Sequence, residues 1–157
     1  MLESAKSRVA VIGLVSMGFG MATSLRRAGL EVTGCDVSAD SVKRFVADGG
    51  KGAGTPAEAA KSADIAVSVV VNAAQTETIL FGTGGVAETL GKGGVFISSA
   101  TMDPDVARRL AKQLEATGRH YLDATPTEGT IYGQANETMA LQVEVIEEPR
   151  AVATHAT

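Results

Sequence analysis

The sequence is poor in cysteine, in aromatic residues and in positive charge. Of its 157 residues, one is cysteine, none is tryptophan and 4% are aromatic. Because Cys35 stands alone, no disulfide can form within the chain, and we interpret it as a small core side chain rather than a nucleophile. The formal net charge of −4 gives no electrostatic reason to expect nucleic acid or an anionic membrane as a partner.

Long apolar runs are also missing. The run at residues 9–15 is too short to cross a bilayer, and residues 1–7 lack the apolar core of a secretory signal. We therefore expect a cytoplasmic protein. Hydrophobic residues nevertheless make up 45% of the sequence, and the length suffices for one globular domain with a substantial core.

The most informative stretch is a strand, a glycine turn and a helix at residues 8–28. Residues 9–12 form an apolar run, Gly13 ends it, and Gly18 opens a stretch with helical periodicity. Such a turn directs backbone N–H groups and the positive end of a helix dipole at one point, which suits a phosphate. Asp36 ends a second apolar stretch, near the spacing at which an acidic residue meets the ribose of a dinucleotide.

This glycine motif is incomplete. A full dinucleotide fingerprint would place glycines at 13, 15 and 18, but position 15 is Val, which adds bulk and disfavours a positive φ. A tight turn that binds no ligand is therefore an open alternative. The sequence argues against a P-loop, because Phe19 and Gly20 follow Gly18 where Lys and Ser or Thr are required.

Strand and helix patterns alternate along the rest of the chain. Strands are expected at 9–12, 30–35, 65–71, 95–98 and 120–122, with a possible last strand at 138–146. Helices are expected at 18–28, 40–48, 55–61, 72–81 and 103–117, with a short helical turn at 86–90 and a turn at 49–52. This order predicts an α/β fold of the Rossmann type, a doubly wound, mainly parallel sheet with helices on both faces.

Several motifs in the right order resemble a known family. Val11-Ile12-Gly13-Leu14-Val15-Ser16-Met17-Gly18, Ser98-Ser99-Ala100-Thr101-Met102-Asp103-Pro104 and Leu122-Asp123-Ala124 resemble the amino-terminal domain of the β-hydroxyacid dehydrogenases. That family includes the 3-hydroxyisobutyrate, tartronate semialdehyde and 6-phosphogluconate dehydrogenases. Val71-Asn72-Ala73-Ala74-Gln75 with Leu80-Phe81-Gly82 most resembles its L-threonate dehydrogenase branch. The resemblance covers roughly residues 8–124.

The resemblance implies a cofactor site at three strand ends, and it implies neither a metal site nor a catalytic residue in this chain. Its residues are Gly13, Leu14, Val15, Met17, Gly18, Asp36, Val70, Val71, Gln75 and Thr101. The glycine turn would contact the pyrophosphate, and Asp36 would bind the adenosine ribose and favour NAD over NADP by repelling a 2′-phosphate. Gln75 would lie near the nicotinamide ribose and Thr101 beside the nicotinamide. For these two, a helix cap or turn group is an equally open interpretation.

Two departures from the family bear on activity. Where the family binds the substrate carboxylate with Ser-Gly-Gly, this chain has Thr127 and Glu128, so Thr127 is a weak candidate for the substrate hydroxyl contact. The family's general acid and base is a lysine in a second, helical domain, whereas no lysine follows Lys112 here. We therefore expect a dinucleotide-binding domain at 1–146, a flexible tail at 147–157 and no helical domain.

The functional hypothesis is that the chain is the NAD-binding domain of an oxidoreductase that transfers hydride between a small hydroxy acid and NAD. We expect little or no turnover by this chain alone. The partners expected are a dinucleotide, a small hydroxy acid and a second copy in a homo-oligomer. The alternative is a degenerate, non-catalytic binding or assembly module, or a gene fragment, of the same fold.

Overall fold

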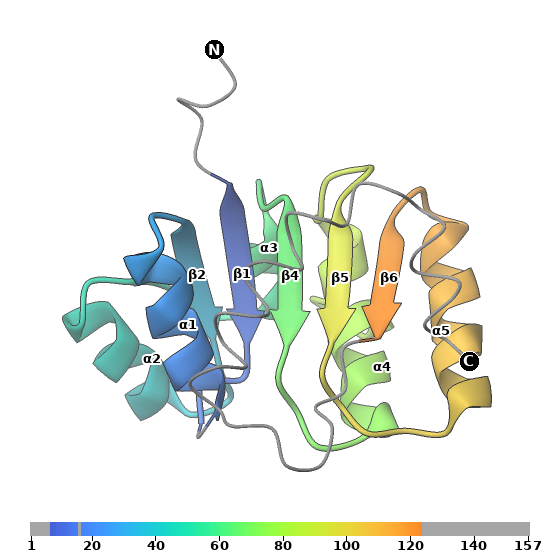
Figure 1. Cartoon of the computed structure of the whole chain (residues 1–157), viewed down its shortest axis with the longest axis horizontal. Helices are drawn as coiled ribbons and strands as arrows, with labels where there is room; N and C mark the ends of the chain where they lie inside the picture. Colours follow the sequence, from blue (N-terminus) through green and yellow to red (C-terminus); the bar gives the residue numbers. More distant parts are fainter. Residues whose placement is uncertain (1–6, 16, 124–157) are drawn as a thin grey trace.

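A computed structural model describes residues 7–15 and 17–123 (Figure 1). The strands are β1 (Arg8–Ile12), β2 (Glu31–Cys35), β3 (Lys51–Ala53), β4 (Ile65–Ser68), β5 (Val95–Ser98) and β6 (His120–Asp123). The helices are α1 (Met17–Arg27), α2 (Ala39–Ala47), α3 (Pro56–Ala60), α4 (Ala73–Phe81) and α5 (Pro104–Glu115), with a 3-10 turn η2 (Val86–Glu88).

In the described part of the chain the six strands form one parallel sheet in the order β3-β2-β1-β4-β5-β6. Helices α1 and α2 lie in front of the sheet in Figure 1, and α3 and α4 lie behind it. Helix α5 contacts α4 through an ion pair between Arg109 and Glu77. The doubly wound α/β prediction is confirmed, and the strand order reverses between β1 and β4, where such folds bind ligands.

The core lies on both faces of the central strands. Ala10, Ala66 and Phe96, from three neighbouring strands, are each fully buried. Three of the expected helices begin at a capping side chain, because Thr55, Asn72 and Asp103 each accept a hydrogen bond from a backbone N–H of the first turn. These caps fix the points at which the chain leaves each loop and enters a helix.

Two elements differ from the sequence-based expectation. Residues 51–53, which overlap the turn expected at 49–52, extend the sheet as β3, where Lys51 and Ala53 pair with Thr33 and Cys35. The expected strand 65–71 ends at Ser68, because the sheet pairing stops there and Val71 is 78% exposed. The possible strand at 138–146, the tail at 147–157 and Thr127 lie outside the described residues.

None of the helices in the described part is both long and apolar enough to span a bilayer.

Candidate functional site

The turn between β1 and α1 brings three backbone segments too close together for side chains. Gly13 has a φ of +103°, and a Cβ atom built on it would lie 2.3 Å from the carbonyl oxygen of Val69. A Cβ atom on Gly18 would lie 1.8 Å from the carbonyl oxygen of Gly13. The first glycine therefore lets the loops after β1 and β4 meet, and Gly18 lets α1 start directly against the strand.

Helix α1 begins at the carboxyl edge of the sheet. It is 11 residues long, so its N-terminal N–H groups and its dipole present partial positive charge beside the turn. Its first turn holds no acidic side chain, and Arg26 and Arg27 lie in its last turn. Met17, the first residue of the helix, is half-buried. This end of the sheet is therefore suited to an anionic group such as a phosphate.

Asp36 follows β2 and joins that strand to the turn after β1. One carboxylate oxygen accepts a hydrogen bond from the N–H of Leu14 at 2.6 Å, and the other accepts one from the N–H of Ser38 at 2.8 Å. The two bonds hold the carboxylate beside the glycine turn with lone pairs left over, since an ionised carboxylate has about four acceptor positions. The sequence indicated Asp36, but it gave no sign of the Leu14 amide that orients it.

Val15 takes the place of the middle glycine without backbone strain. Among the described residues other than glycine, Ser62 has a positive φ and Val15 does not. The expected backbone penalty at position 15 therefore does not arise. The Val15 side chain is 61% exposed at the mouth of the turn, so its bulk is the feature that a bound ligand would meet.

The loop after β4 forms the neighbouring wall. The Asn72 side chain accepts from the N–H of Gln75 at 2.9 Å, and the Gln75 side-chain oxygen accepts from the N–H of Val71 at 2.9 Å. These bonds resemble a capping box, so Gln75 has the local role that the helix-cap interpretation anticipated. Val70 is half-buried and Val71 is exposed, which places their backbone along the surface of the loop.

The end of β5 is bound to the end of β4. The Ser99 hydroxyl donates to the carbonyl oxygen of Ser68 at 2.7 Å in a buried setting, and the Ser99 N–H donates to the same oxygen at 3.1 Å. Thr101 follows in an exposed position. The predicted site residues of β1, β2, β4 and β5 thus lie at one edge of the sheet, and Ser99 is a bracing residue that sequence reasoning did not single out.

Cys35 lies beneath this edge at the end of β2. It is buried, and burial, together with the negative charges of Asp36 and Glu58, raises the pKa of its thiol to about 11. A thiol with such a pKa stays protonated near neutral pH, so the structure supports a core role for Cys35. The described residues contain no group of three or more His, Cys, Asp or Glu side chains that could hold a metal ion.

Comparison with known proteins identifies the family. Residues 8–146 match the model of the NAD binding domain of 6-phosphogluconate dehydrogenase. The chain belongs to this family. The NAD-binding domain described here has its glycine turn, its acidic residue and its strand reversal at the same edge of the sheet, an arrangement that fits a nicotinamide dinucleotide.

Relatives of this NAD-binding domain include L-threonate dehydrogenases and 3-hydroxyisobutyrate dehydrogenases. L-threonate dehydrogenase of Cupriavidus necator is 40% identical over 129 residues, which cover 82% of this chain and 43% of that protein. Mitochondrial 3-hydroxyisobutyrate dehydrogenase of Mus musculus is 31% identical over 150 residues, covering 96% of this chain and 44% of that protein. The crystal structure of 3-hydroxyisobutyrate dehydrogenase from Salmonella typhimurium has a TM-score of 0.74 at 35% identity, covering 79% of this chain and 43% of that one.

These matches confirm the resemblance to the L-threonate and 3-hydroxyisobutyrate dehydrogenases. The chain spans less than half the length of these relatives and corresponds to their NAD-binding domain.

Proposed function

We propose that this domain binds NAD in preference to NADP, along the edge formed by the loops after β1, β2, β4 and β5. The observation that carries the proposal is the Asp36 carboxylate, held 2.6 Å from the Leu14 amide beside the glycine turn. A negative charge there accepts hydrogen bonds from ribose hydroxyls and repels a 2′-phosphate. Val37 and Ser38 follow Asp36, so no arginine stands there to receive that phosphate.

The roles of the other residues follow from their places along this edge. The pyrophosphate lies against the turn at Gly13, Leu14 and Val15 and against the start of α1 at Met17 and Gly18. Because the N–H groups of Gly13 and Leu14 already donate to the Cys35 carbonyl and the Asp36 carboxylate, the N–H groups of Val15 and Met17 are its candidate donors. The backbone of Val70 and Val71, with Gln75, lies along the nicotinamide half, and Thr101 lies beside the ring. When bound, the nicotinamide supplies the acceptor for a hydride, and the residues of this edge orient it.

We further propose that the parent reaction oxidises a small hydroxy acid of the L-threonate or 3-hydroxyisobutyrate type. The support is the named chemistry of the relatives. Thr127 is the candidate contact for the substrate carboxylate. The 157 residues supply no lysine after Lys112, so we propose that this chain alone binds cofactor without turning over substrate at a useful rate.

Calorimetric titration with NADH and with NADPH tests the binding proposal. We expect saturable binding of NADH and at least about tenfold weaker binding of NADPH, which is the effect of about one unfavourable charge contact. Asp36→Asn should weaken the binding of NADH and reduce the difference in affinity between NADH and NADPH. Asp64→Asn is the matched control, because the Asp64 carboxylate also accepts a backbone N–H, that of Arg8, but at the opposite edge of the sheet.

The outcomes separate the hypotheses. If millimolar NADH produces neither heat nor a thermal shift, the binding proposal fails and the non-catalytic assembly module becomes the better description. If NADH binds and the chain also reduces NAD rapidly with L-threonate, the proposal on turnover is wrong while the proposal on binding stands.

A further inference from the structure

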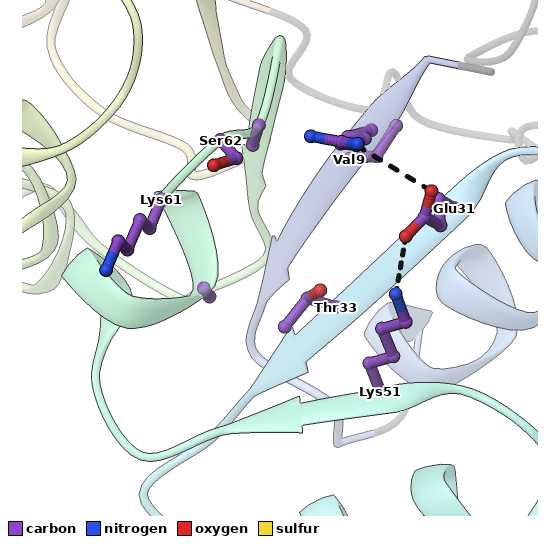
Figure 2. Close-up of a pocket in the computed structure, with 9 residues that line it drawn as sticks. Val9, Glu31, Thr33, Lys51, Lys61 and Ser62 are labelled. Atoms are coloured by element: carbon purple, nitrogen blue, oxygen red, sulfur yellow. Dashed lines mark hydrogen bonds and ion pairs between the residues drawn. The ribbon is translucent and has the colours of Figure 1, made fainter. Parts of the chain in front are cut away.

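A pocket of about 270 Å³ opens at the edge of the sheet opposite the glycine turn (Figure 2). Its walls come from strands β1, β2 and β3, from the end of α3 and from the loop between α3 and β4. At roughly 30 Å³ for each water in the liquid, this space equals about nine water molecules, which suits a compact organic ion. Nothing in the proposed NAD site uses this pocket, because the two lie at opposite ends of the strands.

The lining is positively charged although the chain as a whole is acidic. Arg8, Lys51 and Lys61 line the pocket together with a single carboxylate, that of Glu31. Glu31 lies between two of the cations: its carboxylate pairs with the Arg8 Nε at 3.7 Å and with the Lys51 ammonium (Figure 2). Three cations against one carboxylate leave a local excess of positive charge in a chain of formal net charge −4.

The pocket is also rich in hydrogen-bond donors. Thr33 lies on β2, and Ser62 lies on the loop before β4 (Figure 2). Neither hydroxyl forms a hydrogen bond with any residue that the structure describes, and within the same residues Lys61 has no ion pair. Figure 2 shows the Lys61 side chain directed away from Glu31, so this long side chain needs a rotamer change to meet a ligand.

Ser62 shapes this wall. It has a φ of 67°, a left-handed conformation that costs a non-glycine residue free energy. The chain reverses at this residue between α3 and β4, which places Ser62 and Lys61 opposite β2, the strand that carries Thr33 and Glu31 (Figure 2).

We propose that this pocket is a binding site for a compact organic polyanion, a small molecule with two or more carboxylate or phosphate groups. Arg8 and Lys51 bind one anionic group, and the hydroxyls of Thr33 and Ser62 donate to its oxygens. Glu31 competes with the ligand for both cations and so limits its affinity. Lys61 turns to the second anionic group at the mouth of the pocket.

Backbone amide NMR of the whole chain, titrated at constant ionic strength, tests the site with two probes: citrate for carboxylates and inorganic pyrophosphate for phosphates. Saturable shifts at the amides of Thr33, Lys51 and Ser62 are expected with at least one probe, and the probe that saturates first identifies the preferred group. Shifts at Gly13 and Gly18 report binding at the glycine turn and keep the two sites separate. No saturable shift at the first three amides with millimolar citrate or pyrophosphate would overturn the proposal.

Charge variants then test the arrangement. Lys51→Met should lower the affinity for the probe about fivefold, which is the effect of about one unit charge at contact distance in water. Glu31→Gln should raise that affinity by a similar factor. Thr33→Val keeps the shape, removes the hydroxyl and should weaken binding about twofold or more. Lys92→Met, at an exposed lysine outside the pocket, is the matched control. Equal weakening by Lys51→Met and Lys92→Met would show general charge attraction and overturn the proposal.

Discussion

The carboxyl and amino edges of this sheet are held together by different kinds of contact. At the carboxyl edge, backbone atoms meet backbone atoms: a Cβ on Gly18 would lie 1.8 Å from the oxygen of Gly13, and the Asp36 carboxylate is held by two N–H groups. At the amino edge, the contacts are ion pairs between exposed side chains: Arg8 and Lys51 both pair with the Glu31 carboxylate at the surface. One edge depends on geometry and the other on charge.

This difference predicts how each edge responds to substitution. A close backbone contact cannot relax without moving a strand or a helix. A substitution that forces it apart therefore lowers the free energy of unfolding by on the order of 3 kcal/mol. Exposed ion pairs contribute about 0–1 kcal/mol, because water and salt screen them. The carboxyl edge should therefore tolerate few changes, whereas the amino edge can change its charge with little effect on the fold.

Gly18→Ala is the substitution with the largest expected effect. Alanine favours a helix over glycine by about 1 kcal/mol, but the clash with the Gly13 carbonyl forces α1 away from β1 at a cost of about 3 kcal/mol or more. The clash dominates, so we expect a net loss of unfolding free energy of about 2 kcal/mol or more in urea titrations, together with loss of NADH binding.

Gly54→Ala is the matched control. A Cβ on Gly54 would lie 3.6 Å from the Glu58 carboxylate, an ordinary contact, and Gly54 does not have a positive φ. This variant should change the unfolding free energy by less than about 0.5 kcal/mol. Equal destabilisation by the two variants would show that the close approach at Gly18 has no special weight.

The sequence predicted what depends on neighbours along the chain. The helix starts near residues 55, 72 and 103 could be predicted because the caps that fix them, Thr55, Asn72 and Asp103, act over three residues or fewer. The apolar runs likewise located the central strands, because strands buried on both faces leave an unbroken hydrophobic signal. The glycines at 13 and 18 marked the turn because Gly13 ends the apolar run of the first strand and Gly18 opens the helical pattern.

What the sequence did not predict depends on contacts between distant residues. Strand β3 contains Gly52 and follows two glycines, a composition that favours a turn, and its pairing with β2 decides the outcome. The run of valines after Ser68 continues the apolar pattern, although the sheet pairing ends there. The bond from Leu14 to Asp36 joins residues 22 positions apart, so no local pattern could reveal it.

Ionisation of the Cys35 thiol at high pH should have a smaller effect on stability, and it tests how well the carboxyl edge excludes water. Its pKa is raised to about 11 from an ordinary value of 9.0, mainly by burial. The raised pKa favours the protonated thiol in the folded state, so stability is full below about pH 9 and falls as the pH rises toward 11. We expect a loss of about 1 kcal/mol by about pH 10 from this group.

Urea unfolding of the wild type and of Cys35→Ala across this pH range isolates that loss, because Tyr121, whose pKa burial also raises, titrates in both proteins. The variant should show the flatter pH dependence. Parallel curves would mean that water reaches the thiol, and rapid reaction of Cys35 with a thiol reagent in the native state would lead to the same conclusion.

Val15→Gly should have the smallest effect on stability of the three, and it separates the role of the backbone from that of the side chain at the carboxyl edge. Val15 has no positive φ to relieve and is 61% exposed, so glycine offers the turn no strain relief and lowers its stability slightly by adding freedom to the unfolded chain. Its benefit is space, and we expect NADH to bind about fivefold more tightly, a change of about 1 kcal/mol. Val15→Thr keeps the shape and should leave the affinity unchanged. If NADH binds the glycine variant no better than the wild type, the Val15 side chain lies clear of the pyrophosphate, and the backbone alone sets the affinity of the turn.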